Sequence, residues 1–336
     1  MKILITGAAG FIGAALAKKL LTEDHIILGV DNHNDYYSQD LKESRIQNFY
    51  KHSQYTHRRL DIADRKNLES VFADFKPEIV VNLAAQAGVR YSIENPFAYV
   101  DANISGFMTI LEGCRHHQIK HLVYASSSSV YGGNRNLPFS VNDSVDHPMS
   151  MYAATKKANE SMAHAHAHLW DLPTTMFRFF TVYGPWGRPD LALYKFVDAI
   201  LDDRPIDIYN DGDMYRDFTY VGDLVRGIRM LVDAAPQRPD NADIIPDYDS
   251  LSPVAPYRVV NIGNSDKVKL LDFIDAIEEC LGKQAIRNYM PMQKGDVPGT
   301  WADNGLLREL TGFRPDTNFK DGIRQFVEWY RIYVGK

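Results

Sequence analysis

The sequence predicts an α/β fold: a doubly wound parallel sheet with a smaller C-terminal lobe. Three observations predict it. Short apolar runs alternate with longer segments of helical period as far as residue 180. The first of these runs leads directly into glycines spaced by three residues. Beyond residue 180 the alternation becomes irregular, which indicates a second lobe of different construction.

The first unit is a strand, a glycine turn and a helix. Residues 3–5 are a short apolar strand, Gly7, Gly10 and Gly13 follow, and residues 11–21 have helical period. In a dinucleotide-binding (Rossmann) unit such glycines permit a tight turn, a close approach of backbone to pyrophosphate, and packing of helix on strand. The helix N-terminus then offers N–H groups to the phosphates. The spacing matches the general fingerprint only loosely, so a plain glycine turn is the competing interpretation.

Asp31 ends the second predicted strand, at residues 25–30, about 20 residues beyond the glycines. A carboxylate in that place can bind both ribose hydroxyls of the adenosine. It also repels the 2′-phosphate of NADP, so the sequence favours NAD as cofactor.

Further cofactor contacts are expected where later strands end. A strand at 55–60 ends before Asp61, which can accept from the adenine amino group or cap the next helix, expected at 67–75. A strand at 78–85 ends in small residues that leave room for a ligand. The predicted cofactor residues are Gly7, Gly10, Phe11, Ile12, Gly13, Asp31, Asn32, Asp61, Ile62, Leu83, Ala84, Ala85, Asn103, Tyr152, Lys156 and Phe179.

The remaining elements divide the chain at about residue 180. The predicted NAD-binding domain is 1–180 and the substrate-binding lobe is mostly 181–336. Helix 223–232 and strand 259–262 are candidates to return to the first domain. A polar stretch at 32–53 is expected to wrap the adenosine edge and to include a helix near 41–50. The other predicted elements are helices 96–117, 152–169, 192–201, 270–281 and 320–333, strands 121–125, 174–180, 206–209 and 216–221, and an exposed loop at 234–256.

Composition narrows the classes of function. The chain has 336 residues and a net charge of −6, without a basic cluster, which argues against nucleic-acid binding. No apolar run approaches the roughly 18 residues needed to span a bilayer, and the chain opens on a fold strand, so neither a membrane span nor a signal peptide is expected. Two cysteines in helical patterns suit a cytoplasmic protein. No metal site is predicted.

Tyr152 and Lys156 are four residues apart at the start of a predicted helix and therefore share a face. An ammonium beside a phenol, with a nicotinamide cation nearby, favours the phenolate and lowers the tyrosine pKa, which makes the tyrosine a usable general base. Ser127 ends the preceding strand, where its hydroxyl can bind the same substrate oxygen. These three residues are the predicted catalytic group, and a surface Tyr–Lys pair is the alternative.

Four segments together resemble the extended short-chain dehydrogenase/reductases, which act on nucleotide sugars. They are residues 7–13 (GAAGFIG), 82–85 (NLAA), 126–132 (SSSSVYG) and 152–156 (YAATK). Within that group, residues 178–190 (RFFTVYGPWGRPD), 216–221 (RDFTYV) and 293–297 (QKGDV) resemble the UDP-glucuronate 4-epimerases. The resemblance covers nearly the whole chain.

The resemblance implies tightly bound NAD and a UDP-sugar substrate. Tyr152 then takes the proton of the sugar 4-hydroxyl while hydride leaves C4, and the 4-keto sugar turns over and is reduced on its other face. It further implies a homodimer built through helices 96–117 and 152–169. The substrate candidates are Arg216 for the phosphates, Arg188 and Arg90 for the hexuronate carboxylate, Ser128, Ser129 and Thr181 for hydroxyls or that carboxylate, and Asp296.

Related activities remain as alternatives. Nucleotide-sugar 4,6-dehydratases carry an acidic pair where this chain has Ser128 and Ser129, and UDP-glucuronate decarboxylases typically have a glutamate at the latter position. Epimerases of neutral UDP-hexoses such as UDP-glucose are closer, since they need no carboxylate-binding arginine, and epimerases of UDP-N-acetylhexosamines or their uronates also stay open. An NAD-binding sensor without activity is the alternative from another class.

Overall fold

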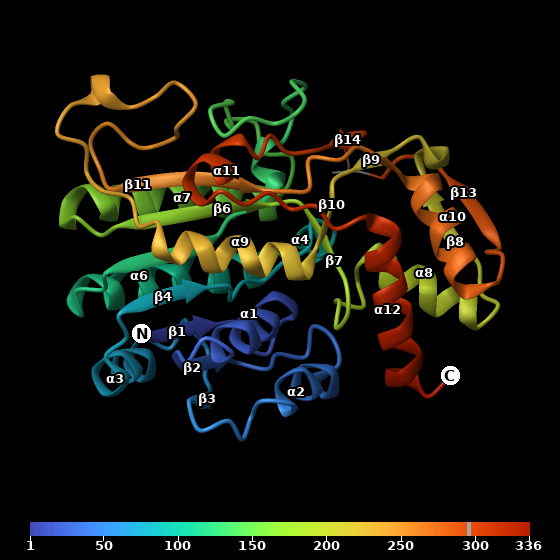
Figure 1. The fold of residues 1–336 in the computed structure, drawn as a ribbon, viewed down its shortest axis with the longest axis horizontal. Helices are drawn as coiled ribbons and strands as arrows, with labels where there is room; N and C mark the ends of the chain where they lie inside the picture. The colour runs from blue at the N-terminus through green and yellow to red at the C-terminus, as the bar shows by residue number, and fades with distance from the viewer. Residues whose placement is uncertain (294–296) are drawn as a thin grey trace.

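The centre of the molecule is a seven-stranded parallel sheet (Figure 1). The structure is a computed structural model that describes residues 1–293 and 297–336. The strands of the sheet are β1 (Lys2–Thr6), β2 (Ile26–Asp31), β3 (Tyr55–Arg59), β4 (Ile79–Asn82), β5 (His121–Ala125), β6 (Thr174–Phe179) and β11 (Tyr257–Ile262). Their order is β11-β6-β5-β4-β1-β2-β3. The predicted doubly wound parallel sheet is confirmed, and β11, from late in the chain, occupies one edge.

Helices cover both faces of this sheet because its strands are apolar on both sides. Ile3 and Ile5 of β1 join one buried cluster, and Leu4 between them joins the cluster on the opposite face. The first face carries α1 (Phe11–Leu21), α9 (Val221–Asp233) and α11 (Gly305–Thr311), with α2 (Gln39–Gln47) beside α1. The second face carries α3 (Arg65–Phe75), α6 (Gly106–His116) and α7 (Met151–Trp170).

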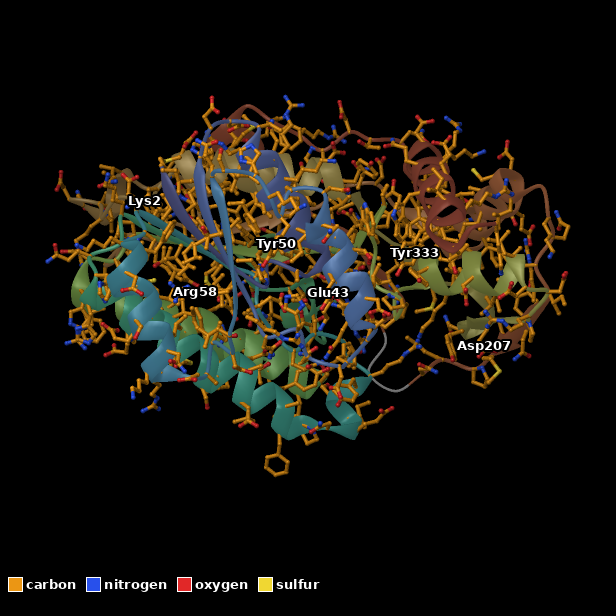
Figure 2. All side chains as sticks on the ribbon, turned by 90° about the horizontal axis from the view of Figure 1, so that it is seen from below. Lys2, Glu43, Tyr50, Arg58, Asp207 and Tyr333 are labelled. Carbon is orange, nitrogen blue, oxygen red and sulfur yellow. The ribbon has the colours of Figure 1, made fainter. Side chains whose placement is uncertain are left out.

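The second lobe has its own apolar core beside the sheet. It contains α8 (Ala192–Leu201), α10 (Leu270–Leu281), α12 (Phe319–Val334), β8 (Ile206–Tyr209) and β13 (Arg287–Met290). The rings of Phe218 and Phe273 stack at 3.8 Å in this core. Figure 2 shows Asp207 of this lobe at the opposite end of the molecule from Lys2 and Arg58 of the sheet.

Small sheets connect the two parts, and here one strand prediction is wrong. The segment predicted as a single strand at 216–221 is β9 (Tyr215–Arg216) and β10 (Phe218–Tyr220), and α9 begins at Val221 instead of residue 223. The division falls at Asp217, whose buried carboxylate accepts backbone N–H groups of Asn264, Ser265 and Ala302. β10 pairs with β7 (Thr181–Tyr183), and β9 pairs with β12 (Val268–Lys269) and β14 (Gly299–Thr300).

The predicted helix 96–117 is not a regular α-helix. It consists of α5 (Pro96–Tyr99), a π-helical segment η1 (Val100–Ser105) and α6, and it is preceded by α4 (Tyr91–Glu94). A π segment widens the turn and is frequent at functional sites. The described residues also contain three short 3-10 helices: η2 (Ser128–Tyr131), η3 (Asn210–Gly212) and η4 (Ala242–Ile244). None of the helices in the described ranges is both long and apolar enough to cross a membrane.

Candidate active site

A cavity of about 510 Å³ opens at the carboxyl ends of the central strands. In an open α/β sheet this edge is where ligands bind. The structure brings together there almost all of the residues predicted for cofactor, catalysis and sugar binding. Those that line the cavity are Gly7, Gly10, Phe11, Ile12, Gly13, Asp31, Asn32, Asp61, Ile62, Leu83, Ala84, Ala85, Ser127, Ser128, Ser129, Tyr152, Lys156, Phe179, Thr181 and Arg188.

The glycine turn has the shape that a dinucleotide needs. Gly7 has a φ of +68°, and a Cβ on it would lie 2.7 Å from the backbone nitrogen of Ala84. A Cβ on Gly13 would lie 2.0 Å from the carbonyl oxygen of Gly7. α1 begins at Phe11 without a side-chain cap on its first N–H groups. These donors and the positive end of the helix dipole face the cavity and fit a pyrophosphate.

Asp31 is held in place by the backbone. Its carboxylate accepts the N–H of Ala9 at 3.0 Å and that of His33 at 2.8 Å. Beside it, Asn32 donates to Asp61 at 2.9 Å, so these two side chains lie together at the cavity as predicted for the adenosine end. The alternative that Asp61 caps the next helix is wrong, since the N-cap of α3 is Asp64, which accepts from the backbone of the third helical residue.

Tyr152 and Lys156 lie on the first turns of α7, whose N-cap is Ser150. The ammonium of Lys156 is buried and donates to the hydroxyl of Tyr124 at 3.1 Å and to the carbonyl oxygen of Ala125 at 2.9 Å. Burial lowers the pKa of Lys156 to about 7, although the negative charge of Glu160 acts to raise it. Lys156 is therefore a fixed donor at the cavity wall.

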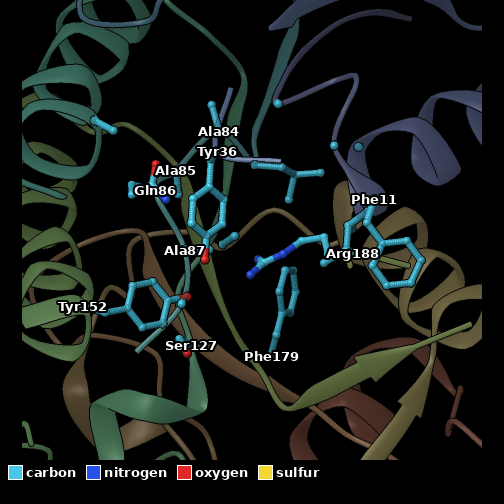
Figure 3. Close-up of a pocket in the computed structure, with 18 of the residues that line it drawn as sticks. Phe11, Tyr36, Ala84, Ala85, Gln86, Ala87, Ser127, Tyr152, Phe179 and Arg188 are labelled. Carbon is cyan, nitrogen blue, oxygen red and sulfur yellow. The ribbon is translucent and has the colours of Figure 1, made fainter. Parts of the chain in front are cut away.

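Ser127 lies next to Tyr152 on one side of the cavity, and Arg188 projects from the other side (Figure 3). Burial raises the pKa of Tyr152, while a hydrogen bond with Ser127 and the charge of Arg188 act in the opposite direction. In the protein alone, desolvation outweighs the favourable charges, and a lowered pKa of Tyr152 beside both Lys156 and a nicotinamide cation stays a prediction for the NAD-bound protein.

Arg188 is presented by the loop after β7 and is paired with Asp190. Its Nε lies 2.9 Å from one carboxylate oxygen, and an Nη2 contact to the other makes the pair bidentate. Burial alone would lower the pKa of Arg188, but Asp190 raises it above the ordinary value. The hydroxyl residues Ser128, Ser129 and Thr181 line the same cavity.

Four predicted site residues do not line the cavity. Asn103 is a correction: it is buried in the π segment and bonds both backbone groups of Gln86, so it supports the cavity wall. Arg90 packs its guanidinium 4.7 Å from the ring centre of Tyr209 in the second lobe. Arg216 donates to the carbonyl oxygens of Tyr215 and Pro298. Asp296 lies outside the described residues.

Sequence reasoning placed the polar segment after β2 at the adenosine edge but named none of its individual lining residues beyond Asn32, and it missed the stretch after β4 together with single residues elsewhere. The adjacent pair Tyr36 and Tyr37, with Lys42 five residues later, is the sequence signal that could have found them in the first segment. The missed lining residues are Asn34, Tyr36, Tyr37, Lys42, Leu60, Gln86, Ala87, Gly88, Val89, Ala102, Ala125, Ser126, Phe180, Val182 and Leu191.

Within residues 1–293 and 297–336, no cluster of three or more His, Cys, Asp or Glu side chains could hold a metal ion. The histidines of α7 bond to protein atoms: His164 to the Ser252 hydroxyl at 2.9 Å and His168 to the carbonyl oxygen of Val254 at 2.8 Å.

A family model described as the NAD dependent epimerase/dehydratase family matches residues 3–245. The chain therefore belongs to this family. It is 49% identical to a "Probable UDP-glucuronate 4-epimerase" of Rhizobium meliloti, over 98% of this chain and 97% of that protein, and 56% identical to "Protein CapI" of Staphylococcus aureus over the full length of both. A crystal structure of UDP-glucuronic acid 4-epimerase from Bacillus cereus, in complex with UDP-glucuronic acid and NAD, matches with a TM-score of 0.85 and 32% identity, over 99% of this chain and 100% of that one.

Proposed function

We propose that the protein interconverts UDP-glucuronate and UDP-galacturonate by epimerisation at C4, with tightly bound NAD and a transient 4-keto sugar. The observation that carries this proposal is that one cavity contains Tyr152 and Ser127 on one side and Arg188 on the other. The cavity thus offers a general base for a carbinol and a cation for a carboxylate. The epimerase names of the similar proteins support the same activity.

The chemistry that NAD supplies when bound is reversible hydride acceptance at C4 of the sugar. The residues that would hold it are those of the glycine turn, Asp31 and Lys156, whose arrangement fits a dinucleotide. Tyr152 takes the proton of the 4-hydroxyl and returns it after the sugar has turned, and Ser127 orients the same oxygen. Desolvation raises the pKa of Tyr152, and the hydrogen bond with Ser127 and the charge of Arg188 act against it; the positive charge of a bound nicotinamide would act in the same direction as these two groups.

An epimerase of a uronate must also prevent decarboxylation. A 4-keto uronate is a β-keto acid and loses CO₂ once its carboxylate is desolvated or turned out of plane. Arg188 together with the hydroxyls of Ser128, Ser129 and Thr181 would keep that carboxylate charged and hydrogen-bonded. The bidentate contact with Asp190 uses one edge of the guanidinium, and the fork of an arginine has a second edge for a substrate carboxylate.

The nucleotide end of the substrate is proposed to lie toward the second lobe. Arg216, on β9, is our candidate for the diphosphate, and Asp296, in the QKGDV segment outside the described residues, is the further substrate candidate that the resemblance implies. Arg90 stacks on Tyr209, and this contact joins the sheet domain to the second lobe at one side. A firm grip on the diphosphate with a loose grip on the sugar would let the keto sugar rotate.

Product analysis by NMR with UDP-glucuronate tests the proposal. Formation of UDP-galacturonate is the expected result. Formation of UDP-xylose would replace it with decarboxylation, and the absence of turnover together with conversion of UDP-glucose or a UDP-N-acetyl sugar would replace it with a neutral-sugar epimerase. One observation favours the neutral-sugar epimerase as a second candidate, because Asp190 already neutralises the charge of Arg188 in the cavity.

We further propose a homodimer formed through the α4–η1 segment and α7. Apolar side chains there are exposed: Phe97 by 78%, Ile93 by 62% and Leu169 by 63%. Large exposed apolar side chains on these elements favour a protein interface. Residence in the cytoplasm remains a prediction, in keeping with two cysteines that form no disulfide.

A further inference from the structure

Three consecutive residues at the end of β5 are each bonded to side chains of α7. The hydroxyl of Tyr124 accepts from Lys156 at 3.1 Å and donates to Asn159 at 2.6 Å. The carbonyl oxygen of Ala125 accepts from Lys156 at 2.9 Å. The hydroxyl of Ser126 donates to Glu160, also at 2.6 Å. The helix that carries Tyr152 is thus joined, residue by residue, to the strand end that leads into Ser127.

Glu160 is the charged member of this set and is itself held by a buried arginine. Arg178 of β6 donates to it through Nε at 3.0 Å and through Nη2 at 2.9 Å, with the two side chains exposed by only 4% and 5%. A bidentate pair of this kind fixes the carboxylate in both distance and orientation. The Ser126 hydroxyl therefore bonds to an oxygen that cannot move without breaking a buried ion pair.

The hydrogen bond between Ser126 and Glu160 lies close in the chain to Ser127 and Tyr152. Glu160 follows Tyr152 by eight residues on α7 and so shares its face, and Ser126 directly precedes Ser127. A shift of the strand end relative to the helix would change the distance between the Ser127 and Tyr152 hydroxyls, which must meet on one substrate oxygen.

We propose that Glu160, fixed by Arg178, is a positioning residue that sets Ser127 against Tyr152 through the hydroxyl of Ser126. The inference rests on the proposed function, which gives Ser127 and Tyr152 their roles. Glu160 does not itself line the cavity, and among the lining residues its hydrogen bond is to Ser126, so it acts through its partners. Its charge also supports the ammonium of Lys156 against burial.

The test is Ser126→Ala, which removes the hydroxyl and leaves the ion pair intact. We expect kcat for UDP-glucuronate to fall at least about tenfold, since a misplacement on the order of 1 Å can cost about 100-fold. KM and the content of bound NAD should stay as in the wild type. The isotope effect with substrate deuterated at C4 should rise, because poorly aligned chemistry becomes rate-limiting.

The matched control is Ser252→Ala. Ser252 is also buried, and its hydroxyl bonds to His164 of the same helix, three turns beyond Tyr152. This variant should lose similar thermal stability with unchanged kcat and isotope effect. An unchanged kcat in Ser126→Ala, or an equal loss in Ser252→Ala, would overturn the positioning role.

A double-variant cycle checks the route. Glu160→Gln and Ser126→Ala act through one bond, so the combined variant should be no slower than the slower single variant. Additive losses would show that Glu160 acts by another path. Failure of the proposed function is seen separately, in the wild type. If the wild type epimerises another UDP-sugar, the ratio of variant to wild-type kcat on that sugar still tests the positioning role of Glu160. If the wild type epimerises no UDP-sugar, both the proposed function and the positioning role are contradicted.

Discussion

Arg45 of α2 donates through Nε to the backbone carbonyl oxygen of Trp186, 141 residues further along the chain, over 2.9 Å. The same guanidinium donates to the carbonyl oxygens of Ala9 at 3.2 Å and Gly187 at 3.3 Å, and to the hydroxyl of Tyr37 at 2.6 Å. One buried cation therefore ties the glycine turn of the cofactor site to the loop that presents the proposed carboxylate ligand.

Replacing this cation should affect both stability and substrate binding. Arg45→Met leaves buried carbonyl oxygens without a donor, so we expect a loss of roughly 2–3 kcal/mol in the free energy of unfolding and a higher KM for UDP-glucuronate. Urea unfolding and steady-state kinetics measure the two. Arg204→Met is the control, since that side chain is 54% exposed and paired at the surface, where a change within about 0.5 kcal/mol is expected. Equal effects of both substitutions would contradict the bridging role.

Tyr152→Phe should abolish turnover while leaving NAD bound. Loss of a general base costs about 100-fold to 10,000-fold, whereas the ring still fills the cavity wall. Turnover is followed by NMR, and NAD is quantified after denaturation of the purified protein. Tyr50→Phe, at an exposed position, serves as control. Activity retained in Tyr152→Phe would mean that another group is the base.

Arg188→Gln should discriminate between acidic and neutral sugars. A charge-assisted hydrogen bond is worth about 1.5–3 kcal/mol, which corresponds to a loss of roughly 10-fold to 150-fold in kcat/KM with UDP-glucuronate. Turnover of UDP-glucose, or inhibition by it, should change little. A similar loss with both sugars would refute a role in carboxylate binding and point to a structural function of the pair with Asp190.

His121 should make the fold sensitive to acid. It is 1% exposed, bonds to the carbonyl oxygen of Val232 and to the hydroxyl of Thr175, and burial lowers its pKa to about 4. With an unfolded value near 6.5, the neutral form is favoured in the native state, so stability is complete above pH 6.5 and falls as the pH drops toward 4. Between pH 7 and pH 5 this residue should account for about 2 kcal/mol.

Urea unfolding at the two pH values measures this contribution. His121→Gln should have a shallower pH dependence than the wild type, even if it is less stable at both values. The same slope in variant and wild type would mean that the pKa of His121 is not lowered in the native state.

Phe97→Asp should dissociate the proposed homodimer. A charge in the centre of an apolar contact is left desolvated without a partner, which is strongly unfavourable. Light scattering after gel filtration should give the mass of one chain for the variant and of two for the wild type. Ile332→Asp, on an exposed residue of α12, is the control. A wild-type monomer would contradict the dimer proposal.

Local patterns predicted the parts of the site that are built by neighbours in the chain. The glycines around α1 and the spacing of Tyr152 and Lys156 determine the backbone geometry within one or two helical turns. The sequence alone therefore predicts where these residues lie relative to one another. The alternation of apolar runs likewise predicted the strand–helix order of the sheet.

Contacts between distant segments account for what could not be predicted. The carboxylate of Asp217 divides a strand because loops 47 and 85 residues away supply its donors. The π segment around Asn103 depends on Gln86 and on α7, and no spacing within the segment indicates it. The helix that carries Lys42 could be predicted, but the place of this side chain at the cavity depends on its bonds to Asn34 in the preceding loop.

The position of β11 at the sheet edge bears on how the chain is made. Its backbone pairs with β6, which is synthesised about 80 residues earlier. The helix α9, which covers α1, is also synthesised after β6. A nascent chain that has emerged only to residue 180 would carry an open strand edge and an uncovered apolar helix, both of which favour aggregation. Final assembly of the sheet must therefore await emergence of the second half from the ribosome, and fragments that end near that point should require chaperones to stay dispersed.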